Sequence, residues 1–118
     1  MAEIVAEYVF SGVAVTNYAA AAAWYERLFG RPADVVVRDE IECMWEIRQG
    51  AWIYIVVDPV RAGRSLVTML VNDLESTLLE ISGRGAGDWE TEILPGVYRK
   101  AIFADGDGNT ITFAQTLQ

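Results

Sequence analysis

Residues 8–30 read YVFSGVAVTNYAAAAAWYERLFG, and this stretch decides the fold that the second half of the chain repeats. Tyr8 to Val15 are rich in β-branched and aromatic side chains, which predicts a strand. Asn17 is a helix-capping residue, and apolar side chains after it recur at the i, i+3, i+4 and i+7 spacing of one helix face. Gly30, followed by Arg31-Pro32, ends that helix. The stretch therefore predicts a strand and then an amphipathic helix.

The same order of elements occurs twice along the chain. Three strand-like segments separated by turn residues follow the first helix, at residues 34–38, 42–48 and 51–57. A strand at 66–71 then leads into a second helix, which we expect to start from a capping box of Asn72 and Glu75. Three more strands are predicted after it, at residues 89–94, 97–104 and 110–114. The apolar stripes of the two helices have the same spacing: Ala21, Trp24, Tyr25 and Leu28 in the first, and Leu74, Thr77, Leu78 and Ile81 in the second. This pattern indicates an internal repeat.

The composition describes one globular domain with an acidic surface. Of its 118 residues, 53% are hydrophobic and 22% charged, so we expect a single domain over residues 1–118. Nine basic residues against seventeen acidic ones give a net charge of −8, which repels phosphate backbones and anionic lipids. We therefore expect neither nucleic acid nor a membrane as partner, and an attraction for cationic ligands.

Histidine is absent from the sequence, which excludes several kinds of active site. No His-containing nucleophilic triad, His-containing zinc site or histidine general base can be built from this chain. The single cysteine, Cys43, forms no disulfide within the chain, which suits a reducing compartment, and no apolar run approaches the roughly 18 residues that span a bilayer. We expect a cytoplasmic protein in which Cys43 is a core residue and not a nucleophile.

Three stretches of the chain resemble the vicinal oxygen chelate superfamily, which includes glyoxalase I, extradiol dioxygenases and the bleomycin and fosfomycin resistance proteins. They are residues 13–30, with an aromatic-Tyr helix ending at Leu28 and Gly30; residues 71–75; and residues 103–111, with a turn in which Gly106 stands where proline is usual. The resemblance implies an α+β fold of two tandem βαβββ modules. They would cover about residues 1–58 and 64–118, with a linker at about 59–63, and their curled mixed sheet would form a cleft.

The enzymes of this superfamily usually hold a divalent metal in the cleft with four side chains, mostly histidine and glutamate. The corresponding positions here are Gly12, Tyr54, Leu66 and Thr112. None offers an imidazole or a carboxylate, and a neutral hydroxyl is a weak ligand. We therefore expect no metal, no other cofactor, and neither glyoxalase nor dioxygenase activity.

The predicted turn at residues 105–109 invites a calcium-loop interpretation, because Asp105, Asp107 and Asn109 place oxygen atoms at alternate positions. Such a loop needs glycine where Thr110 stands and a bidentate glutamate where Thr116 stands. A tight turn is therefore the favoured interpretation.

Strand alternation predicts which side chains line the cleft. It places Trp52 and Tyr54 on one face of their strand and Ile53 and Ile55 on the other, which is the natural core face. The two aromatic rings then either line a ligand cleft or are buried in a dimer interface. The predicted ligand-binding residues are Trp52, Tyr54, Leu66, Thr68 and Thr112, and we expect no catalytic residue among them.

Four glutamates stand in pairs on middle strands of the two halves, and each pair shares a face: Glu42, Glu46, Glu90 and Glu92. A solvated outer face is the favoured placement. A glutamate that faced the cleft instead would bind a cation or act as a general base.

The resemblance and the residues together favour a metal-free, non-enzymatic binding protein. It would be similar to bleomycin resistance proteins, which pair as homodimers, sequester a drug and so confer antibiotic resistance. Its ligand would be a small organic molecule, with a cationic aromatic one favoured by the charge of the chain. Two alternatives remain open: a metal-independent isomerase or lyase that uses a cleft carboxylate, and a dimerisation or partner-binding module without a ligand.

Overall fold

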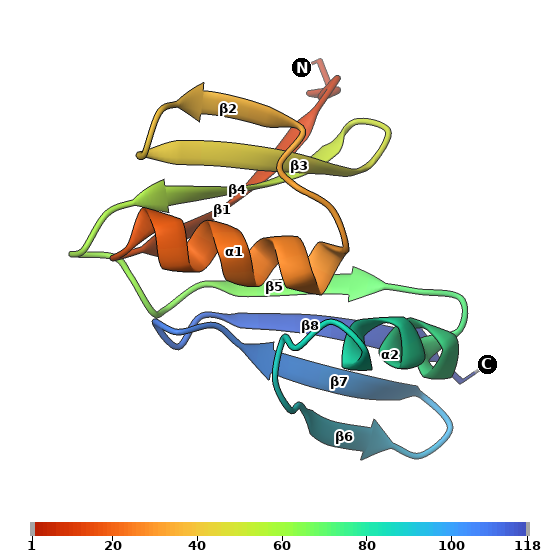
Figure 1. Ribbon diagram of the computed structural model, residues 1–118. Helices are drawn as coiled ribbons and strands as arrows, with labels where there is room; N and C mark the ends of the chain where they lie inside the picture. Colours follow the sequence, from red (N-terminus) through yellow and green to blue (C-terminus); the bar gives the residue numbers. More distant parts are fainter. Residues whose placement is uncertain (1, 118) are drawn as a thin grey trace.

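The computed structural model describes residues 2–117, which fold into two four-stranded sheets with one helix on each (Figure 1). The first half contains β1 (Val9–Val15), α1 (Tyr18–Phe29), β2 (Val35–Arg38), β3 (Glu42–Arg48) and β4 (Ala51–Val57). The second half contains β5 (Leu66–Leu70), α2 (Leu74–Ser82), β6 (Glu90–Leu94), β7 (Tyr98–Ala104) and β8 (Thr110–Thr116). The predicted α+β fold of two βαβββ units is confirmed.

Both sheets have the same strand order and direction. The first is ordered β1-β4-β3-β2 and the second β5-β8-β7-β6. In each, the first strand of the unit pairs in parallel with the last, and the remaining pairs are antiparallel. A parallel pair needs a crossover connection, and the helix and the two intervening strands provide it.

The first helix begins and ends where the sequence predicts. The side chain of Asn17 accepts a hydrogen bond from the backbone N–H of Ala20 at 3.0 Å, which caps the helix. Gly30 follows with φ of 81°, a left-handed conformation that glycine adopts without strain, and its N–H bonds to the carbonyl of Glu26. Tyr25 and Leu28 from the predicted stripe are fully buried.

The second helix starts one residue later than predicted. Its N-cap is Asp73, whose side chain accepts from the N–H of Ser76 at 3.1 Å, and not Asn72. The chain is still paired with β8 at Val71, so it turns only afterwards, and Leu74 then becomes the first helical residue and is buried. A carboxylate at this position also suits the positive end of the helix dipole.

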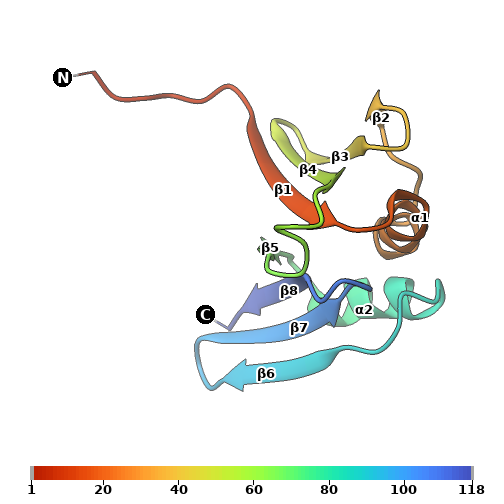
Figure 2. The same cartoon turned by 90° about the vertical axis from the view of Figure 1, so that its left-hand side faces the viewer.

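Both helices lie on the same side of the two sheets, as Figures 1 and 2 show. The core forms between the helices and the sheet faces beneath them, and it includes the predicted core-face residues Ile53 and Ile55. Its largest fully buried side chains are Trp45, Tyr25, Phe103, Leu28, Ile55, Leu74, Ile81 and Ile111. Since these come from both halves of the chain, the two units share one core.

Asn109, in the turn between β7 and β8, joins the two halves through buried hydrogen bonds. Its side-chain oxygen accepts from the backbone N–H groups of Gly63 at 3.1 Å and Ser65 at 2.9 Å. Its side-chain nitrogen donates to the carbonyl of Ala14 at 2.8 Å and to the carboxylate of Asp105 at 2.9 Å. One amide thus fastens β1, the connection between the halves and the β7–β8 turn to one another.

Asp105 extends this junction to the first helix. Its carboxylate accepts the hydroxyl of Tyr25 at 2.7 Å and the backbone N–H groups of Asp107 and Asn109, both at 2.9 Å. The interpretation of residues 105–109 as a tight turn therefore agrees with the structure, but the turn also carries the buried polar contacts between the halves.

Replacing Asn109 with alanine should destabilise the fold by about 3 kcal/mol, because two half-buried backbone N–H groups and a buried carbonyl lose their partner. The midpoint of urea unfolding at unchanged slope measures this loss. Asn72→Ala, an exposed asparagine, is the matched control and should change stability by less than about 0.5 kcal/mol. Equal midpoints for the two variants would contradict the role of Asn109.

Tyr25 should make the protein sensitive to alkali. Burial, and then the adjacent Asp105 carboxylate, raise the pKa of Tyr25 well above its ordinary value of 10.0. The unfolded chain ionises this tyrosine near the ordinary value, so its contribution to stability is complete below pH 10.0 and is lost as the pH rises further. Tyr25→Phe should be less stable at neutral pH by about 1–2 kcal/mol, and the gap should narrow above pH 10.0. Urea unfolding of both proteins over this range tests the expectation, and a constant gap would refute it.

Candidate functional site

The sheet faces turned away from the helices carry the predicted ligand-binding residues. We call these two sheet faces together the open face. On the first sheet it carries Trp52 and Tyr54, and on the second it carries Leu66, Thr68 and Thr112. The alternation that buries Ile53 and Ile55 against the helices turns the residues between and beside them outward.

On the first sheet the aromatic rings of the open face pack on one another and on β1. Phe10 lies opposite Trp52, and their rings stack with centroids 6.1 Å apart and an interplanar angle of 21°. Gly12 lies opposite Tyr54, and a Cβ atom at Gly12 would come within 2.5 Å of the Cζ and hydroxyl oxygen of that ring. The Tyr54 ring therefore lies across β1 and occupies the space of a side chain at position 12.

The indole N–H of Trp52 is a buried donor for which residues 2–117 provide no hydrogen-bond acceptor. Leaving such a group unpaired costs about 1–3 kcal/mol. The ring itself is half-buried. Trp52 is therefore a position on the open face whose polar group the described chain does not satisfy.

On the second sheet the open face has hydroxyl and aliphatic side chains. Thr68 of β5 lies opposite Thr112 of β8; Thr68 is exposed and Thr112 is buried. Leu66, on the same edge strand, is 84% exposed. The five predicted residues therefore share the open face, but the two sheets contribute them separately.

The four glutamates lie on the same sheet face as the predicted ligand-binding residues. The expectation of a solvated face agrees with the exposed Glu90 and Glu92, and it is wrong for Glu42 and Glu46, which lie beside the aromatic rings. Glu46 is paired with Trp52 and Glu42 with Val56 in the β3–β4 register, and directly opposed residues point to the same side. Both are half-buried, whereas Glu90 and Glu92 on β6 are exposed. Acidic groups therefore flank the aromatic part of the open face.

Glu92 belongs to a small polar cluster on the second sheet. It accepts the hydroxyl of Tyr98 at 2.8 Å, and this hydrogen bond raises the pKa of Tyr98. The ammonium of Lys100 lies 4.4 Å from the centroid of the Tyr98 ring, a cation–π contact. Lys100 is paired with Ala114 across β7 and β8, so this cluster faces the same side as Thr112.

A cavity of about 140 Å³ opens on the first sheet, and its lining residues are Gly12, Ala14, Tyr54, Val56, Asp58, Arg61 and Ser65. Of the five predicted residues, only Tyr54 lines it. Pockets that hold small organic ligands usually measure roughly 300–1,000 Å³. This cavity accommodates a part of such a ligand and not the whole of it.

The positions that hold a metal in the enzymes of the resembling superfamily do not fit one here. Gly12 and Leu66 have no donor atom, and the hydroxyls of Tyr54 and Thr112 are poor ligands. The Tyr54 ring also fills the place where a ligand at position 12 would stand. Over residues 2–117, no three imidazole, thiol or carboxylate side chains come together in a way that could hold a metal ion.

Cys43 is buried beneath α1, as expected for a core residue. Burial raises the pKa of its thiol, which keeps it protonated and unreactive. Neither helix in the described part of the chain has the length and apolar character needed to cross a membrane.

Phe10 and the open-face direction of Glu42 and Glu46 were missed by the sequence reasoning. The alternation of side chains along β1 could have identified Phe10. Phe10 is two residues from Gly12 and therefore points to the same face, and Gly12 lies opposite Tyr54. The direction of the glutamates depends on the register of β3 against β4, which shifts between Glu46 and Arg48 and leaves no mark in the sequence.

No protein-family model and no curated protein matches this chain. Among solved structures, a glyoxalase / bleomycin resistance protein from Catenulispora acidiphila superposes with a TM-score of 0.87 at 35% sequence identity, covering 92% of this chain and 97% of that one. The antibiotic binding protein TnmS3 from Streptomyces sp. CB03234 superposes with a TM-score of 0.69 at 19% identity, covering 98% of both chains. Lactoylglutathione lyase from Agrobacterium tumefaciens has a TM-score of 0.72 at 12% identity, with 91% of each chain covered.

The last two similarities concern the fold alone, since their sequence identity is low. The first combines 35% identity with nearly complete coverage of both chains. Together with the two βαβββ units and the shared core, it shows that this chain belongs to the glyoxalase/bleomycin resistance protein family of the vicinal oxygen chelate superfamily.

Proposed function

We propose that this protein binds a small organic molecule, of the antibiotic type, on its open face, and holds it without a metal and without transforming it. It does so as a homodimer in the cytoplasm. The proposed ligand-binding residues are Trp52, Tyr54, Leu66, Thr68 and Thr112, now joined by Phe10.

The packing of Tyr54 over Gly12 carries this proposal. In the enzymes of the superfamily these positions supply metal ligands, whereas here an aromatic ring lies over a glycine. Restoring a ligand at position 12 would require the ring to move. The site is therefore built for contact with apolar and planar surfaces rather than for coordination.

The chemistry of the open face favours a planar cationic ligand. Phe10 and Trp52 present stacked rings, and the half-buried Glu46 lies directly across the strand pair from Trp52. Aromatic faces and carboxylates both attract cations, and the net charge of −8 steers them toward the protein. An antibiotic binding protein has the same fold, which supports a small organic molecule as ligand.

The exposed apolar residues support the homodimer. Residues 2–8 run away from both sheets (Figure 2), and Ile4 is 96% exposed. On the open face, Leu66 and Leu70 of β5 are 84% and 70% exposed. Large apolar side chains exposed on one sheet face are typical of surfaces that bind another protein. A second copy on this face would also add walls to the cavity of about 140 Å³, which is too small for a drug-sized ligand.

Trp52→Leu should weaken binding of bleomycin or of the flat cation proflavine by at least about tenfold, because the largest stacking surface is lost. Titration calorimetry measures the affinity. Trp89→Phe is the matched control: Trp89 packs on Phe103, on the helix side of the second sheet, and its loss should leave the affinity unchanged. EDTA should change neither value.

Recovery of the ligand after incubation separates binding from catalysis. An unchanged ligand agrees with sequestration. Equal loss of affinity in both tryptophan variants, or no binding of any cationic aromatic compound in a broad panel, would argue against the proposed site.

Leu70→Glu should shift the protein from dimer to monomer, since each dimer would bury two new charges in an apolar interface. Sedimentation equilibrium should show a dimer dissociation constant raised by at least about tenfold. Leu79→Glu is the control, because Leu79 on α2 is 71% exposed on the opposite side of the sheets. A wild-type protein that sediments as a monomer would refute the homodimer.

A second candidate function is a metal-independent isomerase or lyase. The half-buried Glu42 and Glu46 on the open face favour it, because a carboxylate beside a bound ligand can act as a general base. A transformed ligand in the recovery experiment, with turnover abolished by Glu46→Gln, would select this function over sequestration.

A further inference from the structure

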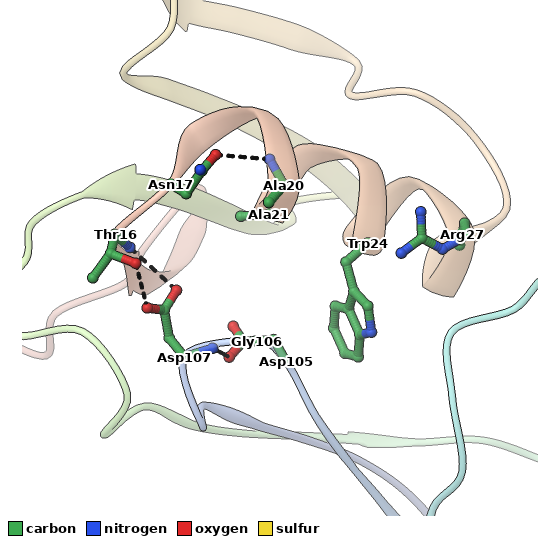
Figure 3. A pocket seen from close by; sticks show the side chains of 9 residues that line it. All are labelled: Thr16, Asn17, Ala20, Ala21, Trp24, Arg27, Asp105, Gly106 and Asp107. Carbon is green, nitrogen blue, oxygen red and sulfur yellow. Dashed lines mark hydrogen bonds between the residues drawn. The ribbon is translucent and has the colours of Figure 1, made fainter.

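A second cavity lies on the helix side of the molecule, remote from the open face. It measures about 310 Å³ and lies between α1 and the β7–β8 turn (Figure 3). Its walls include Thr16, Ala20, Trp24 and Arg27 from the first half of the chain, and Asp105, Gly106 and Asp107 from the second. The volume falls within the range of small-ligand sites.

The ring of Trp24 is held in place beside this cavity. Its indole N–H donates to the carbonyl of Ala86 at 3.0 Å, and its ring packs edge-on against Tyr25 with centroids 4.7 Å apart. The side chain nevertheless remains half-buried rather than fully enclosed, and it lines the cavity. Trp24 therefore offers a fixed aromatic surface whose polar atom is already satisfied.

Two side chains of opposite charge lie on either side of the Trp24 ring, as Figure 3 shows. Arg27 is anchored by its Nε, which donates to the carbonyl of Gly85 at 3.2 Å, and forms no ion pair with any residue from 2 to 117. Asp107 is anchored by Thr16, whose N–H and hydroxyl donate to it at 3.1 and 2.7 Å. Each keeps polar atoms for a further partner: the terminal nitrogens of Arg27 and the second lone pairs of the Asp107 oxygens.

Gly106 leaves one wall of the cavity without a side chain. A Cβ atom built at this position would meet nothing within 4 Å, and its φ lies outside the left-handed region. The space beside it is therefore open, and we expect a larger residue at this cavity wall to narrow the cavity without backbone strain.

From this arrangement we propose that the cavity is a second binding site, for a small zwitterionic aromatic molecule. The carboxylate of the ligand pairs with Arg27, its ammonium pairs with Asp107, and its ring packs on Trp24. The molecule needs both charges, because the net charge of −8 disfavours a simple anion and the cavity also contains a guanidinium. Since Trp24, Arg27 and Asp107 are already fixed by hydrogen bonds, little ordering is required when the ligand binds.

Occupation of this site should also stabilise the fold. The cavity is built by both halves of the chain, and the anchors of Trp24, Arg27 and Asp107 all connect one half to the other. A ligand that bridges them binds only the docked arrangement and raises the unfolding temperature by mass action.

The test uses 4-(aminomethyl)benzoate, which has a cation and an anion at opposite ends of one ring. In ¹⁵N-labelled protein, the indole N–H signal of Trp24, assigned with the Trp24→Phe variant, should shift saturably during titration while that of Trp52 does not move. Benzoate and benzylamine, which each lack one charge, should bind at least about tenfold more weakly.

Substitutions then locate the site. Gly106→Leu should abolish the shift at unchanged thermal stability. Gly83→Leu, at a glycine with φ of −78° that does not line the cavity, should leave the shift intact. Arg27→Gln should weaken 4-(aminomethyl)benzoate by about tenfold and leave benzylamine unaffected. The absence of a saturable Trp24 shift, or one that survives Gly106→Leu, overturns the proposal. Movement of the Trp52 signal alone assigns the compound to the open face and also overturns it, while leaving the proposed function standing.

Discussion

The buried hydrogen bonds of Asn109 are the constraint on which the arrangement of the two halves depends. One carboxamide uses both ends: it accepts from the connection before β5 and donates to β1 and to Asp105. A buried amide that loses its partners is costly, so few relative positions of the halves satisfy this residue. The shared core, the placement of both helices on one side and the common direction of the open faces all follow from that docking.

Within this frame, the character of the open face depends on which side chains occupy four strand positions. The same fold holds metal enzymes and binding proteins, so the fold does not decide the function. Here a glycine on β1 admits the ring of Tyr54, and an aliphatic and a hydroxyl side chain take the corresponding places on the second sheet. These positions offer no metal-coordinating group, and the face presents aromatic rings and carboxylates instead, the groups on which the proposed binding of a planar cation depends.

The two sides of the molecule therefore differ in chemistry for structural reasons. The open face presents exposed leucines and rings, and it is where a second copy and a ligand would both bind, so the two events are linked in the proposed function. On the helix side, a cavity opens between α1 and the β7–β8 turn. The side chains that fasten the halves together also surround this cavity of about 310 Å³.

The sequence by itself determined the elements and their inner and outer faces. The helical spacing of Ala21, Tyr25 and Leu28 predicts α1, and the alternation of Ile53 and Ile55 with Trp52 and Tyr54 predicts which face of β4 is buried, because both are periods of the local backbone. The absence of metal ligands at the four family positions was likewise evident from residue types alone. The errors in predicting the helix ends from local sequence were small: the N-cap of α2 is Asp73 and not the predicted Asn72.

The tertiary structure decided everything that depends on residues distant in the chain. The hydrogen bond from Asn109 to Ala14 joins residues 95 positions apart, and the one from Trp24 to Ala86 joins residues 62 positions apart. No local sequence pattern can predict either hydrogen bond. The side of Glu46 depends on its register against Trp52. The second cavity exists only where α1 meets a turn from the other half of the chain. The periodicity of apolar residues and the secondary-structure propensities depend on residues close together in the chain. These contacts instead depend on how whole segments dock. The docking is determined by the burial of shared apolar surface and the pairing of buried polar groups.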